Sequence, residues 1–245
     1  MYHHTIEQLR GLRLNGMAAA FAQQLSDAVF SDLAFEQRMQ MLVEAETAER
    51  DTQRYQRILK KAKLKVIAAP EDLDYRPGRG LDKAVMADLL TCSWIGAHRN
   101  VLITGATGTG KTWIGCALGV KAARLGIPVV YRRTARLLEE MSIGHDDGTI
   151  ARQRNQLGKA QLLILDDFGL TALSSRGRAD LLEVLDDRVG AGATIILGQM
   201  PVKDWHGFIN DPALADAILD RLVHSSVKID LKGESMRRVK SRGGQ

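Results

Sequence analysis

The sequence predicts an α/β fold in which a small all-helical N-terminal segment precedes a five-stranded parallel sheet. Two observations predict this fold class. From about residue 99, five short apolar runs alternate with helical stretches, which is typical of a parallel sheet covered by helices on both faces. Before that point no strand-like alternation occurs, and apolar residues recur at three- and four-residue steps, which indicates helices.

The helical first third is expected to contain two short helices and one long helix. Apolar residues from Ile6 to Val29 keep helical spacing, and Asn15-Gly16 divides them into two helices. The long helix is expected from about Ser31 to Leu64. The prolines and glycines that follow oppose regular structure. The predicted organisation is a helical domain over residues 1–66, a linker over 67–80 and the α/β domain over 81–245.

The α/β domain follows from its apolar runs, each short enough to be a buried strand. The strands are expected at residues 100–105, 127–132, 161–167, 193–199 and 227–232. The helices between them are expected at Lys111–Leu125, Thr134–Met141, Arg176–Val189 and Pro212–Leu219.

Composition excludes several classes of protein. With 245 residues, 45% of them hydrophobic and 26% charged, the chain suits one or two globular domains rather than a disordered or fibrous protein. No apolar run reaches the roughly 18 residues of a membrane helix, and the start of the chain does not resemble a signal peptide. Two cysteines form no paired framework, so a reduced, cytoplasmic location is expected.

The clearest chemistry lies in the segment GATGTGKT at residues 105–112, which matches the pattern G-x-x-x-x-G-K-[ST] between a predicted strand and a predicted helix. Such a loop points backbone N–H groups at phosphate oxygens. We expect Lys111 to reach the β- and γ-phosphates and the Thr112 hydroxyl to ligate Mg²⁺. The phosphate-binding residues are Gly105, Ala106, Thr107, Gly108, Thr109, Gly110, Lys111 and Thr112.

The second element is an apolar strand that ends in two acids, LLILDDFG. The carboxyl ends of parallel strands meet at the edge of the sheet where ligands bind, so both carboxylates are expected beside the phosphates. Asp166 is placed to hold Mg²⁺, and Asp167 to orient or deprotonate the attacking water.

Together, GATGTGKT, LLILDDFG, ATIILGQMPVKDWH and ADAILDRLVHSSVKIDLKGESMRR resemble the IstB-type transposition helper ATPases. These belong to the branch of AAA+ ATPases that also contains the bacterial helicase loader DnaC. The resemblance covers residues 65–240. It implies an AAA+ P-loop NTPase fold, and, since the chain stops at 245, no helical C-terminal lid domain is expected.

The resemblance also implies a function. It implies an ATP-dependent protein that assembles as a homo-oligomer on duplex target DNA, with ATP at the subunit interfaces, and that recruits or stimulates a partner transposase. ATP and Mg²⁺ are the implied cofactors. Hydrolysis is expected to be slow, because Asp167 stands where AAA+ proteins usually carry glutamate.

Three further residues carry roles over from the family. Gln199 ends the fourth strand, where AAA+ proteins often place a polar sensor of the γ-phosphate. Arg221, near the end of the last predicted helix, resembles the arginine finger that reaches a neighbouring subunit's nucleotide; the alternative is a cation that favours its own helix end. Arg237 or Arg238 resembles a second sensor, or else belongs to a basic tail on DNA.

Basic residues cluster at the end of the long helix, after the second strand and before the acidic strand. Each cluster is either a DNA contact or a solvated face. Because aromatic residues are only 5% of the chain, backbone contacts with duplex DNA are favoured over base stacking. The expected DNA contacts are Lys60, Lys61, Lys63, Arg132 and Arg133.

Other functions remain open from the sequence. A DnaC-like helicase loader would share the ATPase and differ in its partner. A small-molecule P-loop kinase would not need the helical front segment or Arg221. A third alternative is a binding module that uses ATP only as a clamp.

Overall fold

The computed structural model describes residues 2–236, so Arg237 and Arg238 lie outside the described residues. The chain divides into two compact units, residues 1–57 and residues 58–245. The helix α3 (Phe35–Ala62) begins in the first unit and ends in the second.

The first unit contains α1 (Tyr2–Gly11), α2 (Asn15–Ser26), the short 3₁₀ helix η1 (Ala28–Asp32) and most of α3. The break between the first two helices lies before Asn15-Gly16, at a turn where Arg13 has a φ of 61°. Gly16 instead lies inside α2, where a Cβ atom would collide with the Ala45 carbonyl of α3. The Glu46 carboxylate accepts a hydrogen bond from the Gly16 N–H at 2.9 Å and so caps the start of α2.

The second unit is built on a five-stranded sheet. Its strands are β1 (Val101–Gly105), β2 (Val129–Arg133), β3 (Leu162–Phe168), β4 (Ala193–Gly198) and β5 (Val227–Leu231). They pair in parallel in the order β2-β3-β4-β1-β5. All five predicted strands are therefore confirmed, with ends displaced by at most two residues.

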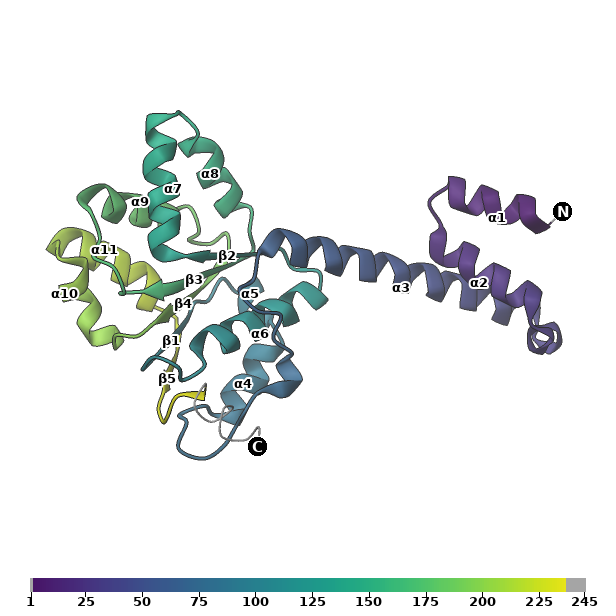
Figure 1. Ribbon diagram of the computed structural model, residues 1–245, viewed down its shortest axis with the longest axis horizontal. Helices are drawn as coiled ribbons and strands as arrows, with labels where there is room; N and C mark the ends of the chain where they lie inside the picture. Colours follow the sequence, from purple (N-terminus) through teal and green to yellow (C-terminus); the bar gives the residue numbers. More distant parts are fainter. Residues whose placement is uncertain (1, 237–245) are drawn as a thin grey trace. The chain divides into compact units, whose positions relative to one another are not determined.

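Helices cover both faces of this sheet (Figure 1). The helices of the second unit are α4 (Lys83–Leu90), α5 (Ser93–Gly96), α6 (Lys111–Arg124), α7 (Thr134–Asp146), α8 (Ile150–Gly158), α9 (Ser175–Asp186), α10 (Trp205–Ile209) and α11 (Pro212–Val223), with the 3₁₀ turns η2 (Pro70–Asp72) and η3 (Val202–Asp204). One apolar cluster joins the sheet to α4, α5, α6 and the end of α3; a second joins it to α7–α11.

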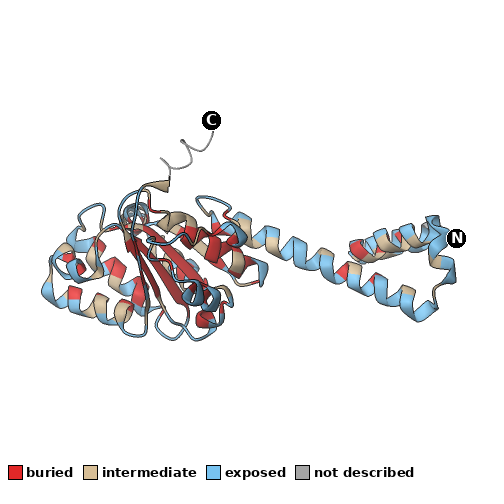
Figure 2. Cartoon of the chain, turned by 90° about the horizontal axis from the view of Figure 1, so that it is seen from below, coloured by how far each residue is buried: buried red, intermediate tan, exposed pale blue. Residues whose placement is uncertain are grey.

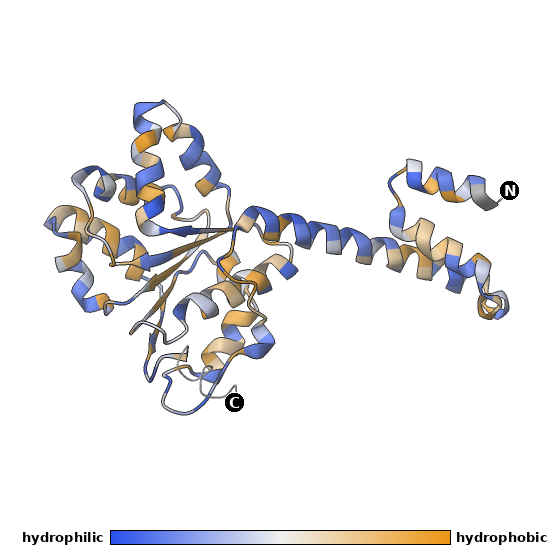
Figure 3. Ribbon diagram, in the orientation of Figure 1, coloured by the Kyte–Doolittle hydropathy of each residue, from blue (hydrophilic) through white to orange (hydrophobic). Residues whose placement is uncertain are grey.

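The inner strands β1, β3 and β4 are buried along nearly their whole length, whereas the edge strands β2 and β5 and the outer surfaces of the helices carry exposed residues (Figure 2). Hydropathy follows the same division, and long stretches of α3 and α8 are hydrophilic (Figure 3). Since the three inner strands lie between two helical layers, they lack the alternation typical of a half-exposed strand, whereas β5 alternates exposed Lys228 and Asp230 with buried Ile229 and Leu231. Within residues 2–236, no helix combines the length and apolar content that crossing a membrane requires.

Two polar side chains fix the amino edge of the sheet, where the strands begin. Arg188 is only 2% exposed and donates to the Thr194 hydroxyl at 3.0 Å and to three backbone carbonyls. Asn100, just before β1, accepts from the Thr194 N–H and donates to the Arg221 carbonyl at 2.8 Å. These bonds tie the end of α11 to the amino edge.

Candidate functional site

The loop 105–112 joins the end of β1 to the start of α6, as the sequence predicts. Gly108 and Gly110 have φ values of 88° and 98°, a region that side chains with a Cβ rarely adopt. Gly105 lies so close to the Leu231 carbonyl that a Cβ would collide with it. The glycines therefore set the path of a loop that presents the N-terminus of α6 as an anion-binding site.

The Lys111 ammonium lies over this loop. Its Nζ donates to the carbonyls of Gly105 at 2.7 Å and Ala106 at 2.8 Å. Burial lowers the pKa of Lys111, and the nearby carboxylates of Asp166 and Asp167 oppose this effect. A half-buried cation that bonds only to carbonyl dipoles is available to an anion of higher charge, such as a phosphate.

Asp166 is almost completely enclosed, with 1% exposure. Its Oδ2 atom accepts from the Thr112 hydroxyl at 2.8 Å and from the Tyr131 hydroxyl at 2.6 Å, while Oδ1 accepts from the Asp167 N–H at 2.8 Å. The Lys65 ammonium lies 3.9 Å from Oδ2. Burial raises the pKa of Tyr131, so this hydroxyl stays protonated and remains a donor.

The pair formed by Thr112 and Asp166 fits a magnesium ion. Mg²⁺ prefers oxygen ligands and is commonly held by one or two protein groups, with waters and phosphates completing its coordination. Here a hydroxyl and a carboxylate already meet beside the phosphate loop. Among the residues that the structure describes, no group of three or more His, Cys, Asp or Glu side chains offers another metal site.

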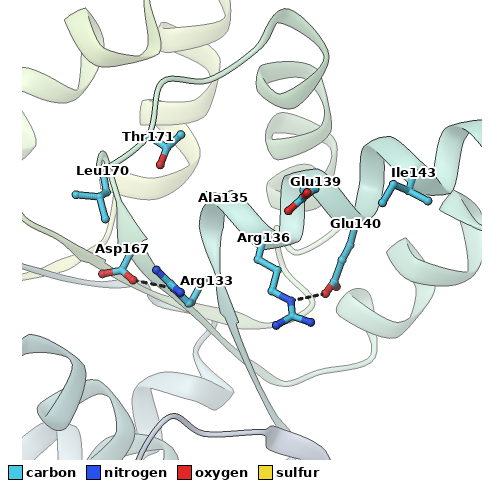
Figure 4. Close-up of a pocket in the computed structure, with 9 residues that line it drawn as sticks. All are labelled: Arg133, Ala135, Arg136, Glu139, Glu140, Ile143, Asp167, Leu170 and Thr171. Atoms are coloured by element: carbon cyan, nitrogen blue, oxygen red, sulfur yellow. Dashed lines mark hydrogen bonds and ion pairs between the residues drawn. The ribbon is translucent and has the colours of Figure 1, made fainter.

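Asp167 differs from its neighbour in conformation and in partner. Its φ is 57°, in the left-handed region that costs energy for most residues, and its side chain is 23% exposed. Arg133, at the end of β2, donates from Nε to the Asp167 carboxylate at 3.0 Å. Figure 4 shows this contact at the wall of a groove, whereas Arg136 is directed toward Glu140 on its own helix.

Gln199 lies at the same carboxyl edge, directly after β4. Its Oε1 atom accepts a hydrogen bond from the Thr107 hydroxyl of the phosphate loop at 2.9 Å. The structure therefore brings together the loop, Asp166, Asp167 and Gln199. A cavity of about 720 Å³ runs along these four elements and is large enough for a nucleotide.

Part of this cavity is lined by residues outside the motifs that the sequence analysis identified. Lys65, Leu73, Asp74, Arg76 and Arg79 all contribute to its wall. Arg79 donates to the Thr109 carbonyl of the loop at 2.8 Å. The segment 67–80, predicted as a linker, thus also forms one side of the cavity. The available signal in the sequence is Arg79, a basic residue between two glycines in PGRG.

Arg221 lies at the opposite edge of the sheet. Its backbone carbonyl contacts Asn100, the residue before β1, whereas the phosphate loop begins at the other end of that strand. The five residues of β1 separate these points by roughly 16 Å at about 3.3 Å per residue. The Arg221 guanidinium pairs with Asp186 at 2.8 Å. Arg221 therefore lies too far away to act on its own loop.

The predicted DNA contacts fall in two groups. Lys60 and Lys61 are exposed on the last turn of α3, and Lys63 is exposed in the turn that follows. Arg132 is half-buried and donates to the Tyr131 carbonyl, while Arg133 holds Asp167. None of the described hydrogen bonds or ion pairs joins the two groups.

The family described as IstB-like ATP binding protein matches residues 7–243. The chain belongs to this family. The protein y4pL of Sinorhizobium fredii, named as an insertion sequence ATP-binding protein, is 45% identical over 240 residues, which are 98% of each chain. The ATP-binding protein named for insertion sequence IS1162 of Pseudomonas fluorescens is 48% identical over 202 residues, covering 82% of this chain and 87% of that one.

Solved structures agree with the AAA+ fold of this family member. The DnaC helicase loader aligns with a TM-score of 0.55 at 17% identity, over 67% of this chain and 97% of the loader. The replication initiator DnaA, bound to AMPPCP and single-stranded DNA, aligns with a TM-score of 0.59 at 17% identity, over 74% of this chain and 55% of the initiator. At these identities the likeness concerns the fold alone, and it confirms the fold class predicted from the sequence.

Proposed function

We propose that this protein is an ATP-hydrolysing assembly factor that oligomerises on duplex DNA and engages a transposase during transposition. Membership of the IstB-like family and the names of the insertion-sequence relatives support the link to transposition. The contact between Thr112 and Asp166, beside a complete phosphate loop, is the single observation that supports the ATPase best.

In the proposed reaction each residue of the carboxyl edge has one task. Lys111 and the loop N–H groups bind the phosphates of ATP. Thr112 and Asp166 hold Mg²⁺, which when bound supplies positive charge to the β- and γ-phosphate oxygens. Asp167 orients the attacking water, and Gln199 contacts the γ-phosphate through its amide. The reaction transfers the γ-phosphoryl group to water.

The location of Arg221 supports an oligomer. An arginine at the amino edge cannot reach the loop of its own chain, but it can face the nucleotide of a neighbouring copy. Arginine suits this role because its guanidinium stays charged and binds phosphate oxygens with two parallel hydrogen bonds. ATP would then lie at the interface between subunits.

The Arg133–Asp167 ion pair supports stimulation by DNA. While Arg133 holds the Asp167 carboxylate, this carboxylate is less available to water. A DNA phosphate that binds Arg133 would compete for the guanidinium and release Asp167. DNA binding and hydrolysis would thereby be coupled through one side chain, and the same ion pair would keep turnover slow without DNA.

A mixing experiment tests the proposed oligomer. Arg221→Ala should bind ATP but hydrolyse it slowly, because a finger supplied in trans contributes on the order of 10³–10⁵ in rate in related enzymes. Lys111→Ala should be inactive because its own loop is impaired. When the two variants are mixed on DNA, some interfaces combine an intact loop with an intact Arg221. DNA-stimulated phosphate release should therefore be highest at intermediate ratios. An inactive mixture, with co-assembly shown independently, would contradict the finger.

DNA binding is tested by its dependence on salt. Contacts to the DNA backbone release counterions, so log K should fall with log salt by about 0.9 for each phosphate neutralised. The triple variant Lys60→Ala, Lys61→Ala, Lys63→Ala should flatten this slope. An unchanged slope would assign the three lysines to a solvated surface.

A further inference from the structure

The Arg221 side chain is held in one orientation by the end of a neighbouring helix. Its Nε and Nη2 atoms each lie 2.8 Å from Asp186 Oδ1, at the last position of α9, and Nη1 donates to the Ala217 carbonyl at 2.9 Å. Arg221 is half-buried, whereas the Asp186 side chain is 58% exposed. The arrangement is more specific than a cation at the end of its own helix, because a second helix supplies the carboxylate.

We propose that Asp186 is a positioning residue, which holds the Arg221 guanidinium ready for the nucleotide of a neighbouring subunit. This inference rests on the proposed function, since it requires that Arg221 acts in trans. In this proposal Asp186 itself contacts neither the nucleotide nor the attacking water. It acts through the orientation of Arg221.

The hydrogen-bond arithmetic of the guanidinium supports positioning. An arginine has five N–H donors. Nε and Nη1 donate to Asp186 and to the Ala217 carbonyl, and Nη2 lies at ion-pair distance from the same carboxylate, which leaves at least two N–H groups for an incoming phosphate. The contacts therefore restrict the side chain without occupying all its donors. Because a free arginine side chain samples many rotamers, holding it in advance lowers the entropic cost of ordering it during the reaction.

The end of α9 also offers a matched control. Asp187, the next residue, pairs with Arg154 of α8 at 2.9 Å instead of with Arg221. The two adjacent aspartates are both exposed and both lie at the same helix end, yet each serves a different arginine. Removal of Asp187 therefore reproduces the change in charge without the change at Arg221.

The test compares Asp186→Ala, Asp187→Ala, Arg221→Ala and the double variant Asp186→Ala/Arg221→Ala, all as full-length protein assembled on duplex DNA with ATP and Mg²⁺. Asp186→Ala should lower the turnover number about threefold to tenfold, with ATP affinity within about twofold of wild type. Asp187→Ala should stay within about twofold in both quantities. The double variant should be no slower than Arg221→Ala, because Asp186 has no role once the guanidinium is gone. Asp186→Glu should recover part of the loss.

A second readout separates positioning from a general structural effect. If Asp186 acts from the side of the finger, the Lys111→Ala subunit can supply an intact Asp186–Arg221 pair to the loop of an Asp186→Ala subunit. Activity per intact loop should then rise in the mixture above that of Asp186→Ala alone. A defect inside the Asp186→Ala subunit would give no such rise.

The possible results separate this inference from the proposed function. If Arg221→Ala is slow but Asp186→Ala is as fast as wild type or faster, the positioning role is overturned and the finger stands. If Asp186→Ala and Asp187→Ala are equally slow, the effect belongs to the helix end and the inference is also overturned. If Arg221→Ala keeps full activity, the proposed finger itself fails.

Discussion

The two edges of the central sheet use their polar side chains in different ways. At the amino edge, Arg188 is buried and all its described bonds end on groups of the same subunit, so its role is to hold strands and helices together. At the carboxyl edge, Lys111 and Asp167 lie along a cavity and retain access to a ligand. Arg188 therefore serves the stability of the fold, whereas Lys111 and Asp167 are placed to contact a ligand.

Asp166 and Asp167 show this difference between neighbours in sequence. Asp166 is enclosed and accepts from three groups of the protein, which makes it a fixed ligand. Asp167 has a left-handed backbone conformation and one exposed arginine partner. An ion pair of this kind is weak in stability terms, so it can exchange with another anion. The fixed acid suits a metal, and the exchangeable acid suits a regulated step.

The largest predicted effect of this comparison is the loss of folding stability caused by Arg188→Ala at the amino edge. The change leaves the Thr194 hydroxyl and three carbonyls without their donor, and unsatisfied buried groups cost about 1–3 kcal/mol each. We expect the free energy of unfolding to fall by about 3–5 kcal/mol, allowing for entry of water. Urea denaturation measures this loss. The control Arg136→Ala, at the exposed ion pair with Glu140, should lose less than about 1 kcal/mol, and similar losses in both variants would contradict the comparison.

The next largest effect is the loss of ATP affinity caused by Lys111→Ala at the carboxyl edge. We expect ATP affinity to fall about 30-fold to 1,000-fold, which corresponds to about 2–4 kcal/mol for a buried charge-assisted contact with phosphate. Stability without ligand should not fall, because burial of the ammonium disfavours its charged form, as its lowered pKa indicates. Calorimetry and thermal unfolding measure the two quantities. Lys121→Ala, in the last turn of the same helix, is the control and should keep its affinity for ATP.

Smaller effects should distinguish the role of Asp166 from that of Asp167 when each is replaced by asparagine. Asp167→Asn is expected to bind Mg²⁺ and ATP normally and to hydrolyse at least about tenfold more slowly, since the water loses its carboxylate. Asparagine also tolerates the left-handed backbone at this position, so the change tests chemistry rather than folding. Asp166→Asn should instead weaken the Mg²⁺-dependent part of ATP binding. Identical defects in both variants, measured by nucleotide titration with and without Mg²⁺ and by turnover, would overturn the division of roles.

The sequence predicts one edge of the sheet far better than the other. The phosphate loop and the acids of β3 follow from a fixed pattern, because phosphate binding requires glycines and a lysine at set spacing. The sequence predicts Tyr131 only as a residue of a strand and not as a site residue, because its hydrogen bond to Asp166 depends on the register between β2 and β3. Asp186 was not identified for the same reason: its partner is 35 residues away, and helix packing brings them together.

The helices show where local signals are overridden by packing. Asn15-Gly16 favours a turn, yet both residues lie in α2 because Gly16 allows close contact with α3 and Glu46 caps the helix start. The sequence does not predict the helix α8, since its nine residues include only two large apolar side chains, Ile150 and Leu157, which are too few to reveal a repeat. Strands buried on both faces were predicted well because continuous apolar runs leave few alternatives.

The smallest predicted effect concerns Tyr131→Phe, which removes one of the donors to Asp166 and leaves the ring. A single hydrogen bond to a charged group contributes about 1.5–3 kcal/mol when buried. The Thr112 hydroxyl and the Asp167 N–H still donate to Asp166 and keep part of its restraint. We therefore expect the free energy of Mg²⁺ binding to weaken by about 1 kcal/mol. The Mg²⁺ concentration that supports half-maximal ATP binding should rise about fivefold, with Tyr75→Phe as control. Because burial raises the pKa of Tyr131, the hydroxyl stays a donor from neutral to mildly alkaline pH. The difference in Mg²⁺ requirement between wild type and Tyr131→Phe should therefore not change across that range. A difference that disappears as the pH rises would mean that Tyr131 ionises, and a Mg²⁺ requirement equal to that of wild type would mean that Asp166 needs no hydroxyl from β2 to hold the metal.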